Sequence, residues 1–558
     1  MNKIITFLRS APFNKYFWII LLIKIVFSFF FASEYMTKGF LPFVSYFIEN
    51  GSNPYNYFYS LNQTVFPYPA MMLLLFSVPL FLFKSVIALF GDGGVFIQLF
   101  LMRVPILIAD IAMYLILCKW LPTKEKKVLI LYFASPILFY INYYHGQLDA
   151  IPTAILLLSL FALFKKKVLL SYILLGIGLA TKTHLLIAIP FYFVYLLRAQ
   201  KYPFGKLVLL TILSALVFLI PNSLFYSKGF MESVFNNSEQ LRIFYLSIPF
   251  GYQNIVLFIA PAIILGVFYR FLSYKKFNND SLILSLGLVY TVLIAFVPPM
   301  QGWFYWSLPF LVYFFCKYTN ANIFSFWMMS VFYLLFFIFR EDSDILQSAM
   351  LIIPSVTNMQ IPYYLLQSFG YNPLIVQNIM FTGLEISVLM NAAWSYRIGM
   401  HYNNLYIEKQ KPFIFGMGGN SGVGKSTLTK ALYETLGFKN SLVVNGDDAH
   451  KWERGSEQWK VFTHLNPTGN RIHDDYQQVQ SLKKGNTIER VGYNHKTGRF
   501  TDPITMHSNR FILVQGLHPF FLKNMRELFD LKIYLETSEE LYKKWKTERD
   551  VKKRGYNK

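Results

Sequence analysis

The segment with the most specific chemistry is a glycine-rich loop near residue 420. Residues 419–427 form a complete G-x-x-x-x-G-K-[ST] pattern directly after a short apolar run, 413–417. Glycines let the backbone N–H groups of such a loop surround phosphate oxygens, while the lysine reaches the terminal phosphates and the hydroxyl ligates Mg²⁺. We therefore predict a nucleotide-phosphate site in which Lys425 also acts in catalysis and Ser426 binds Mg²⁺. The predicted site consists of Gly419, Asn420, Ser421, Gly422, Val423, Gly424, Lys425, Ser426 and Thr427.

A second group of candidate residues lies in the first 400 residues, where charged side chains are rare. Glu34 follows the first long apolar run, Asp149 ends a His-Gly-Gln-Leu-Asp segment, and Lys182 lies in Thr-Lys-Thr-His. A carboxylate can accept a proton from a hydroxyl group, and Lys182 or Arg103 can stabilise a phosphate. The alternative reading is structural: solvated acids, a Lys182 that extends to the membrane interface, and an Arg103–Asp110 ion pair on one helix face.

The elements that must position these residues are of two kinds. The chain has 558 residues, of which 54% are hydrophobic and 15% charged, against about 25% charged in an ordinary soluble domain. Residues 401–558 hold 43 of the charged side chains and residues 1–400 only 39. This distribution excludes a single soluble globule and an intrinsically disordered chain. We predict a polytopic α-helical membrane domain over 1–400, a linker over 401–411 and a soluble α/β domain with a parallel sheet over 412–558.

Apolar runs and loop charges predict how the first domain lies in the membrane. Two doubtful runs, 67–90 and 345–366, are placed on the outer side, because the lysine-rich loops then all fall inside, as expected for membrane proteins. We expect about twelve crossings, both termini inside, a multi-pass protein of the cell membrane with its P-loop domain in the cytoplasm, and Glu34, Asp149 and Lys182 at the outer face. The net charge of +22 is assigned to inner loops and not to nucleic-acid binding. The predicted spans are 16–33, 95–118, 128–144, 148–164, 168–183, 184–197, 207–223, 253–272, 281–298, 303–317, 323–340 and 374–396.

Residues 412–558 resemble the phosphoribulokinase/uridine kinase family. Five features occur in the family's order: the glycine-rich loop, a strand that leads to Asp447, the segment 493–498, the strand before Gly516-Leu517-His518, and a basic helix near 549–555. The resemblance implies a P-loop fold, ATP and Mg²⁺, and phosphoryl transfer to a hydroxyl of a nucleoside, sugar or sugar phosphate.

The same resemblance implies roles for individual side chains. Asp447 falls on the acid that takes the proton from the accepting hydroxyl, although an acid at this place can also be a helix N-cap. His450, Tyr493 and His495 fall on the acceptor-binding side. Arg549 and Arg554 fall on the lid that holds ATP, where the alternative is a solvated helix face.

Two residues depart from the family pattern. Gln515 stands where the family usually has Glu, and Asn494 stands in place of an Asp. Because a neutral amide does not attract Mg²⁺-bound water as a carboxylate does, a nucleotide sensor without turnover is an alternative to a kinase. The family's last strand and helix do not appear before Lys558, so we expect either a truncated or a minimal domain.

Residues 16–396 resemble the GT-C-type polytopic glycosyltransferases, which use polyprenyl-phosphate sugars. An acid in the first outer loop, Asn53-Pro54-Tyr55, Gly146-Gln147-Leu148-Asp149 and Thr181-Lys182 occur in that family's order. The resemblance implies that Glu34 and Asp149 act as base or ligate a divalent metal, and that Lys182 and Arg103 bind the lipid phosphate. The family usually has Asp where Glu34 stands.

Three functional classes therefore compete. The first is an enzyme with two activities, a kinase fused to a glycosyltransferase. The second is a glycosyltransferase with a nucleotide-sensing tail. The third is a transporter, although the sequence has no clear internal repeat of the kind that transporters often have.

Overall fold

The computed structural model divides into two compact units, Met1–Tyr406 and Ile407–Lys558. It describes residues 11–251, 253–318, 323–341, 347–349, 362–403, 405, 412–463, 465–494 and 497–554. The first unit is helical and the second contains a parallel sheet, which confirms the predicted fold class at this level. The predicted linker begins inside a helix, because α21 continues to Asn403.

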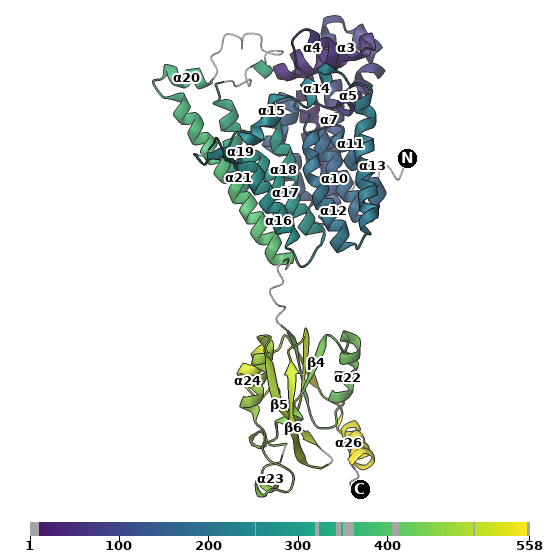
Figure 1. Cartoon of the computed structure of the whole chain (residues 1–558), viewed down its shortest axis with the longest axis vertical. Helices are drawn as coiled ribbons and strands as arrows, with labels where there is room; N and C mark the ends of the chain where they lie inside the picture. The colour runs from purple at the N-terminus through teal and green to yellow at the C-terminus, as the bar shows by residue number, and fades with distance from the viewer. Residues whose placement is uncertain are drawn as a thin grey trace. The chain divides into compact units, whose positions relative to one another are not determined.

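The first unit is built from helices of very different lengths (Figure 1). The long and medium helices are α2 (Lys15–Phe30), α5 (Ala70–Leu82), α7 (Gly94–Trp120), α10 (Ala150–Phe164), α11 (Val168–Leu179), α12 (Ala188–Ala199), α13 (Phe204–Ser223), α16 (Ile259–Leu272), α17 (Asn279–Ala295), α18 (Phe304–Lys317), α19 (Ile323–Ile338) and α21 (Pro373–Asn403). The short helices are η1 (Ala11–Phe13), η2 (Tyr35–Phe40), α3 (Leu41–Asn50), α4 (Pro54–Ser60), α6 (Lys84–Leu89), η3 (Gly91–Gly93), α8 (Glu125–Val128), η4 (Leu129–Phe133), α9 (Pro136–Phe139), η5 (Tyr140–His145), η6 (Thr183–Ile187), α14 (Lys228–Val234), α15 (Ser238–Leu241), η7 (Arg242–Phe244), η8 (Gln301–Trp303), η9 (Gln347–Ala349) and α20 (Pro362–Ser368).

Most predicted spans coincide with helices, with two corrections. Residues 253–258 are not helical, because β1 (Ser247–Pro249) and β2 (Val256–Phe258) form a hairpin whose turn holds Gly251, Gln253 and Asn254 at positive φ. The span predicted over 128–144 is bent by 48° between Glu125–Phe133 and Pro136–His145, as expected where a proline cannot continue the helical hydrogen bonds. Of the doubtful run 345–366, only 347–349 and 362–366 lie within the described residues.

Length and composition support a membrane location for this unit. Among the described helices, α7, α13 and α21 are each long and apolar enough to cross a membrane, and two bent helix pairs raise that number to five. Leu209, Leu219 and Ile220 on α13 are more than half exposed, as apolar side chains facing lipid would be. The expected twelve crossings and their orientation remain predictions.

Small residues allow α10, α11 and α13 to pack closely. The Ser159 hydroxyl donates to the Ser171 carbonyl at 2.7 Å, and the Ser214 hydroxyl donates to the Tyr172 carbonyl at 2.6 Å. A Cβ at Gly176 would lie 2.6 Å from the Ser214 carbonyl oxygen. Close backbone approach with hydroxyl bonds between helices is typical of membrane helix packing.

The second unit is a four-stranded parallel sheet with helices on both faces (Figure 1). The strand order is β4-β7-β3-β8, formed by β4 (Ser441–Asn445), β7 (Phe511–Gln515), β3 (Phe413–Gly419) and β8 (Leu531–Leu535). One face packs against α22 (Lys425–Leu436) and the other against α24 (Ile472–Lys483) and α25 (Lys523–Leu528). The remaining elements are η11 (Gly446–Ala449), α23 (Glu457–Val461), η12 (Pro467–Gly469), α26 (Glu539–Arg554) and a hairpin of β5 (Thr487–Asn494) and β6 (Arg499–His507).

Candidate functional site

The glycine-rich loop joins β3 to the first turn of α22. Gly419, Gly422 and Gly424 all have positive φ angles, of 150°, 99° and 94°, which glycine adopts without steric cost. Lys425 is the first residue of α22, and its Nζ donates to the carbonyl oxygens of Gly419 and Asn420 at 2.8 Å each. The lysine therefore lies over the loop, at a helix N-terminus suited to phosphate.

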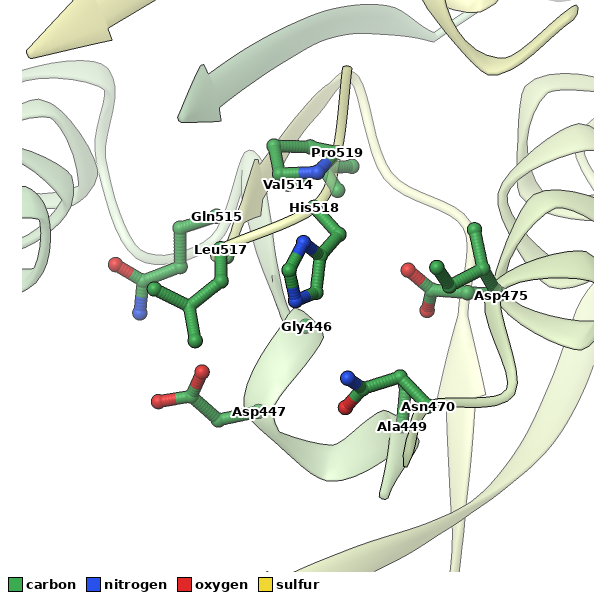
Figure 2. Close-up of a pocket in the computed structure, with 12 residues that line it drawn as sticks. Gly446, Asp447, Ala449, Asn470, Asp475, Val514, Gln515, Leu517, His518 and Pro519 are labelled. Carbon is green, nitrogen blue, oxygen red and sulfur yellow. The ribbon is translucent and has the colours of Figure 1, made fainter. Parts of the chain in front are cut away.

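A pocket lies at the carboxyl ends of β4 and β7, next to this loop. The two strands are hydrogen-bonded neighbours with Asn445 opposite Gln515. Their backbones stay close at Gly446 and Gly516, where a Cβ on either glycine would lie within 3.1 Å of the other segment. Figure 2 shows Asp447 from η11 and His518 from the segment after β7 around the same space. Ligands of open parallel sheets bind at this edge.

Gln515 links the P-loop helix to β4 through both ends of its amide. Its Oε1 accepts from the Thr429 hydroxyl at 2.7 Å, and its Nε2 donates to Asn445 Oδ1 at 2.6 Å. An ionised glutamate could accept from Thr429 but could not donate to Asn445. The departure at this position therefore supplies a bridge between two elements of the site.

The predicted acceptor side comes together in part. The rings of His450 and Tyr493 lie 4.5 Å apart, edge to face, and His450 Nδ1 is 2.9 Å from Asn470 Oδ1. Asn494 Oδ1 accepts from the Thr497 N–H in the hairpin turn. His495 lies outside the described residues. The backbone of α26 carries Arg549 and Arg554, whose side chains the structure does not describe.

The donor set at the pocket fits a Mg²⁺ ion that is held mainly by ATP. Ser426 lies in the first turn of α22, after β3, and Asp447 lines the pocket after β4, so a hydroxyl and a carboxylate both follow strands of the same sheet. Mg²⁺ prefers oxygen ligands and commonly uses one or two protein groups with substrate phosphates and water. Within the described residues, no group of three or more His, Cys, Asp or Glu side chains gathers to hold a metal alone.

A second candidate site surrounds Asp149 in the helical unit. Asp149 is buried; its Oδ1 accepts from Trp306 Nε1 at 2.8 Å and forms an ion pair with Lys182. The Lys182 Nζ also lies about 5 Å from the ring centroids of Tyr68 and Trp306. Gly302 packs directly against this carboxylate, because a Cβ there would overlap Asp149 Oδ2 and would force it to shift. Three predicted outer segments, around Tyr68, Asp149 and Lys182, thus meet with η8.

Several buried polar atoms at this second site have no partner among the described residues. They include Asp149 Oδ2, Gln301 Oε1 and both ring nitrogens of His184. The His184 ring stacks on Trp306 with centroids 4.1 Å apart. Buried polar groups normally have a hydrogen-bond partner, and those that lack one often bind a ligand or a water molecule.

Arg103 and Glu34 occupy different surroundings near this site. Arg103 is buried and donates to the Phe31 carbonyl at 2.8 Å, and its guanidinium packs against Gly146, three residues before Asp149. The considered Arg103–Asp110 pair is wrong, because Asp110 pairs with Lys24 at 2.7 Å instead. Glu34 is 44% exposed and pairs with Lys38 one turn along η2.

The Asn-Pro-Tyr motif has a structural explanation. Asn53 caps α4 by accepting from the Tyr55 N–H, and Pro54 starts the helix. The buried Tyr55 hydroxyl donates to the Tyr68 carbonyl at 2.6 Å. The motif therefore holds the loop that brings Tyr68 beneath Lys182.

Sequence reasoning missed residues whose partners are distant in the chain. Trp306 was not singled out, although its indole N–H donates to Asp149. Arg490 was missed as well: it is 4% exposed, and the available signal was an arginine two residues from Ile488, on the buried face of a strand.

Comparisons with known proteins show a strong similarity for the second unit and a weak one for the first. Residues 414–558 match the Phosphoribulokinase / Uridine kinase family. The chain is 36% identical over 143 residues to a phosphoribulokinase from Synechocystis sp., covering 26% of this chain and 43% of that one. It is 30% identical over 149 residues to a uridine kinase from Borrelia duttonii, covering 25% of this chain and 69% of that one. The chain thus spans less than half the length of the matched phosphoribulokinase.

The helical unit has a weaker structural likeness. The structure of ArnT from Cupriavidus metallidurans bound to undecaprenyl phosphate aligns with 12% identity and a TM-score of 0.35, covering 72% of this chain and 82% of that one. A score of this size does not assign the fold of the helical unit. The family match and the uridine kinase similarity, in contrast, show that this chain belongs, through residues 414–558, to the phosphoribulokinase/uridine kinase family.

Proposed function

We propose that residues 412–558 catalyse phosphoryl transfer from ATP to a hydroxyl group of a nucleoside, sugar or sugar phosphate. The observation that carries the proposal is the position of Asp447. It follows β4 at the same sheet edge as the P-loop that follows β3, and Gln515 bridges the two through Thr429 and Asn445. An acid beside a phosphate-binding loop is what a hydroxyl-phosphorylating site needs.

The residues of the proposed kinase site then have separate tasks. Lys425 and the P-loop amides hold the β- and γ-phosphates, and Asp447 accepts the proton of the attacking hydroxyl. Mg²⁺, when bound, neutralises charge on the transferring phosphoryl group, and Ser426 with Asp447 is the pair of groups that would hold it. His450 and Tyr493 line the acceptor side, and Arg549 and Arg554 are assigned to the ATP lid.

The test is ADP release by the full-length protein purified in detergent. ATP and Mg²⁺ are supplied with a panel of uridine, ribulose 5-phosphate, free sugars and other sugar phosphates. We expect turnover with one acceptor class, lost in Lys425→Ala and in Asp447→Asn. ATP binding without turnover by folded protein would refute the kinase and favour the nucleotide-sensing tail.

We propose a second function for the helical unit, the binding of a lipid-linked phosphate sugar and glycosyl transfer at the Asp149 site. The cations Lys182 and Arg103 carry one more charge than the Asp149 carboxylate neutralises, and several buried polar atoms have no partner among the described residues. An excess of positive charge favours a phosphate headgroup. Asp149 Oδ2, which has no partner among the residues that the structure describes, is available to accept a hydroxyl proton. Glu34 is assigned to the acceptor entrance because its carboxylate is exposed.

The donor set does not fit a divalent metal held at this site by the protein. Asp149 already accepts from Lys182 and Trp306, Glu34 pairs with Lys38, and the described residues hold no cluster of three metal-ligating side chains. The transfer that we propose therefore uses no metal held by these side chains.

The glycosyl-transfer proposal is tested in proteoliposomes with a radiolabelled polyprenyl-phosphate sugar. Transfer should depend on Asp149 and Lys182 and survive Asp280→Asn, a matched change in the ion pair with Lys317. Ion-coupled accumulation of a solute without transfer would support the transporter instead.

The two proposed activities lie in different units, so we propose regulation or supply of a lipid-linked sugar pathway as their connection. In the predicted topology the P-loop domain is cytoplasmic and the Asp149 site faces outward. Lys425→Ala should then lower lipid glycosylation in cells. Unchanged glycosylation would separate the two activities.

A further inference from the structure

Arg490 is a buried arginine of the second unit whose guanidinium contacts Asp475, a residue that lines the pocket. It lies on β5 with 4% of its surface exposed. A buried arginine keeps its charge and is costly to bury unless its donors are satisfied. Its contacts therefore indicate what it holds in place.

The guanidinium contacts three segments of the chain: α24, the end of β4 and the turn that follows it. Nη1 donates to Asp475 Oδ1 at 2.7 Å and to Gln478 Oε1 at 2.6 Å, both on α24. Nη2 donates to the Asn445 carbonyl at 2.6 Å, at the end of β4. Nε lies 3.9 Å from Asp448 Oδ2, in the turn that carries Asp447.

An irregularity in the β5–β6 hairpin lets β5 contact the end of β4 and the turn 446–449 through two different residues. The β5–β6 register shifts between Val491 and Tyr493, and a Cβ at Gly492 would lie 2.7 Å from the Thr501 hydroxyl. A bulge changes which side chains share a face. As a result Arg490 reaches Asn445, while the Tyr493 N–H donates to Asp448 Oδ1 at 3.1 Å.

The contacts continue to the phosphate loop. Asn445 also accepts from Gln515 Nε2 through its side chain, and Gln515 accepts from Thr429 on the P-loop helix. One line of hydrogen bonds thus runs from α24 through Arg490, Asn445 and Gln515 to α22. Asp447 follows Asn445 by two residues along the backbone.

We propose that Arg490 is a positioning residue that sets the turn 446–449, and with it the Asp447 carboxylate, relative to the phosphate loop. This rests on the proposed kinase function of the same pocket. Arg490 supplies no atom to the reaction; it fixes the end of β4 from one side while Gln515 fixes it from the other. It also balances the negative charge of Asp475 and Asp448 beside a pocket that must receive phosphates.

The first measurement is turnover by full-length Arg490→Met with ATP and the panel acceptor that the wild type phosphorylates. We expect kcat to fall about 100-fold, because a displaced catalytic group costs that much even when the change is remote, while the KM for ATP stays unchanged. Arg490→Lys keeps the charge but not the fork of donors, so it should recover only part of kcat. The matched control is Arg510→Met. Arg510 is an exposed arginine directly before β7, at the amino ends of the strands, and the pocket lies at their carboxyl ends.

The second measurement does not depend on the acceptor. Amide hydrogen exchange in full-length protein should be faster at 446–450 in Arg490→Met and unchanged at 428–436, because local opening follows the lost contacts. Unchanged exchange at 446–450 overturns the positioning role whether or not the kinase is active. Absence of wild-type turnover, with altered exchange, refutes the kinase alone.

A less disruptive variant covers the case in which Arg490→Met does not fold. Gln478→Met removes one acceptor of Nη1 and leaves the Asp475 pair intact. We expect a smaller fall in kcat in the same direction, again without a change in ATP KM. Wild-type kcat in folded Gln478→Met, together with wild-type exchange at 446–450, overturns the inference.

Discussion

Two lysine–aspartate pairs in the helical unit have the same chemistry but different surroundings. Lys24 and Asp110 join α2 to α7, and both side chains are fully buried. Asp110 Oδ2 accepts from Lys24 and from the Tyr143 hydroxyl at 2.7 Å, and Oδ1 accepts from the Tyr305 hydroxyl at 3.1 Å. Every oxygen of this carboxylate is therefore used within the fold.

The Lys182–Asp149 pair is incomplete by comparison. Lys182 is 18% exposed, and both Lys182 and Trp306 contact Oδ1, which leaves Asp149 Oδ2 buried without a partner among the described residues. A satisfied buried ion pair stabilises one arrangement of helices, whereas an unsatisfied one has capacity left for a ligand. The difference supports a structural role for the first pair and the ligand-binding role that we propose for the second.

The largest expected effect follows from breaking the complete pair. Asp110→Ala leaves the Lys24 ammonium buried without its counter-charge, which typically costs about 3–5 kcal/mol of stability. Thermal unfolding of the detergent-purified protein should show a strongly lowered Tm. A Tm equal to the wild type would remove the distinction between the two pairs.

Asp149→Asn should leave the stability nearly unchanged and remove glycosyl transfer. The amide keeps the size of the side chain and can still accept from Trp306, so the Tm should change little. Glycosyl transfer should fall at least about 100-fold, the effect expected when a general base is removed. Transfer rates in proteoliposomes measure this, with Asp280→Asn as a control in a third buried ion pair, with Lys317. A large Tm loss with normal transfer would reverse the assignment.

Gly302→Ala tests how tightly the second site is built. The added methyl overlaps Asp149 Oδ2, so the carboxylate must shift, at a cost of about 1–3 kcal/mol. We expect reduced transfer with the protein still folded, measured by the same transfer and unfolding assays. Transfer at the wild-type rate would show that Oδ2 is not needed where it lies.

The smallest expected effect is in a double variant of the complete pair. Lys24→Met combined with Asp110→Leu removes both charges, and such replacements are often neutral or stabilising. The Tm should return close to that of the wild type, with transfer retained. Lys182→Met combined with Asp149→Leu should instead remain inactive, since a ligand site is not restored by apolar packing. Recovery of transfer in that second double variant would contradict the comparison.

The sequence determined those features in which neighbouring residues act together. The P-loop pattern predicted its strand, loop and helix because positive-φ glycines, Lys425 and the helix N-terminus are contiguous. Apolar runs predicted most helices, since burial or lipid exposure requires continuous apolar surface. The hairpin at 247–258 was not predicted, because its strands are short and apolar and only the turn residues distinguish them from a helix.

The tertiary structure alone decided which distant side chains meet. Asp110 lies seven residues from Arg103, yet it pairs with Lys24, 86 residues away. Asp149 Oδ1 accepts from Trp306, 157 residues away, and Gln515 bonds Thr429 and Asn445 on two other elements. Local periodicity places a residue on a face of its own helix or strand, but its partner depends on how the elements pack, which no short stretch of sequence contains.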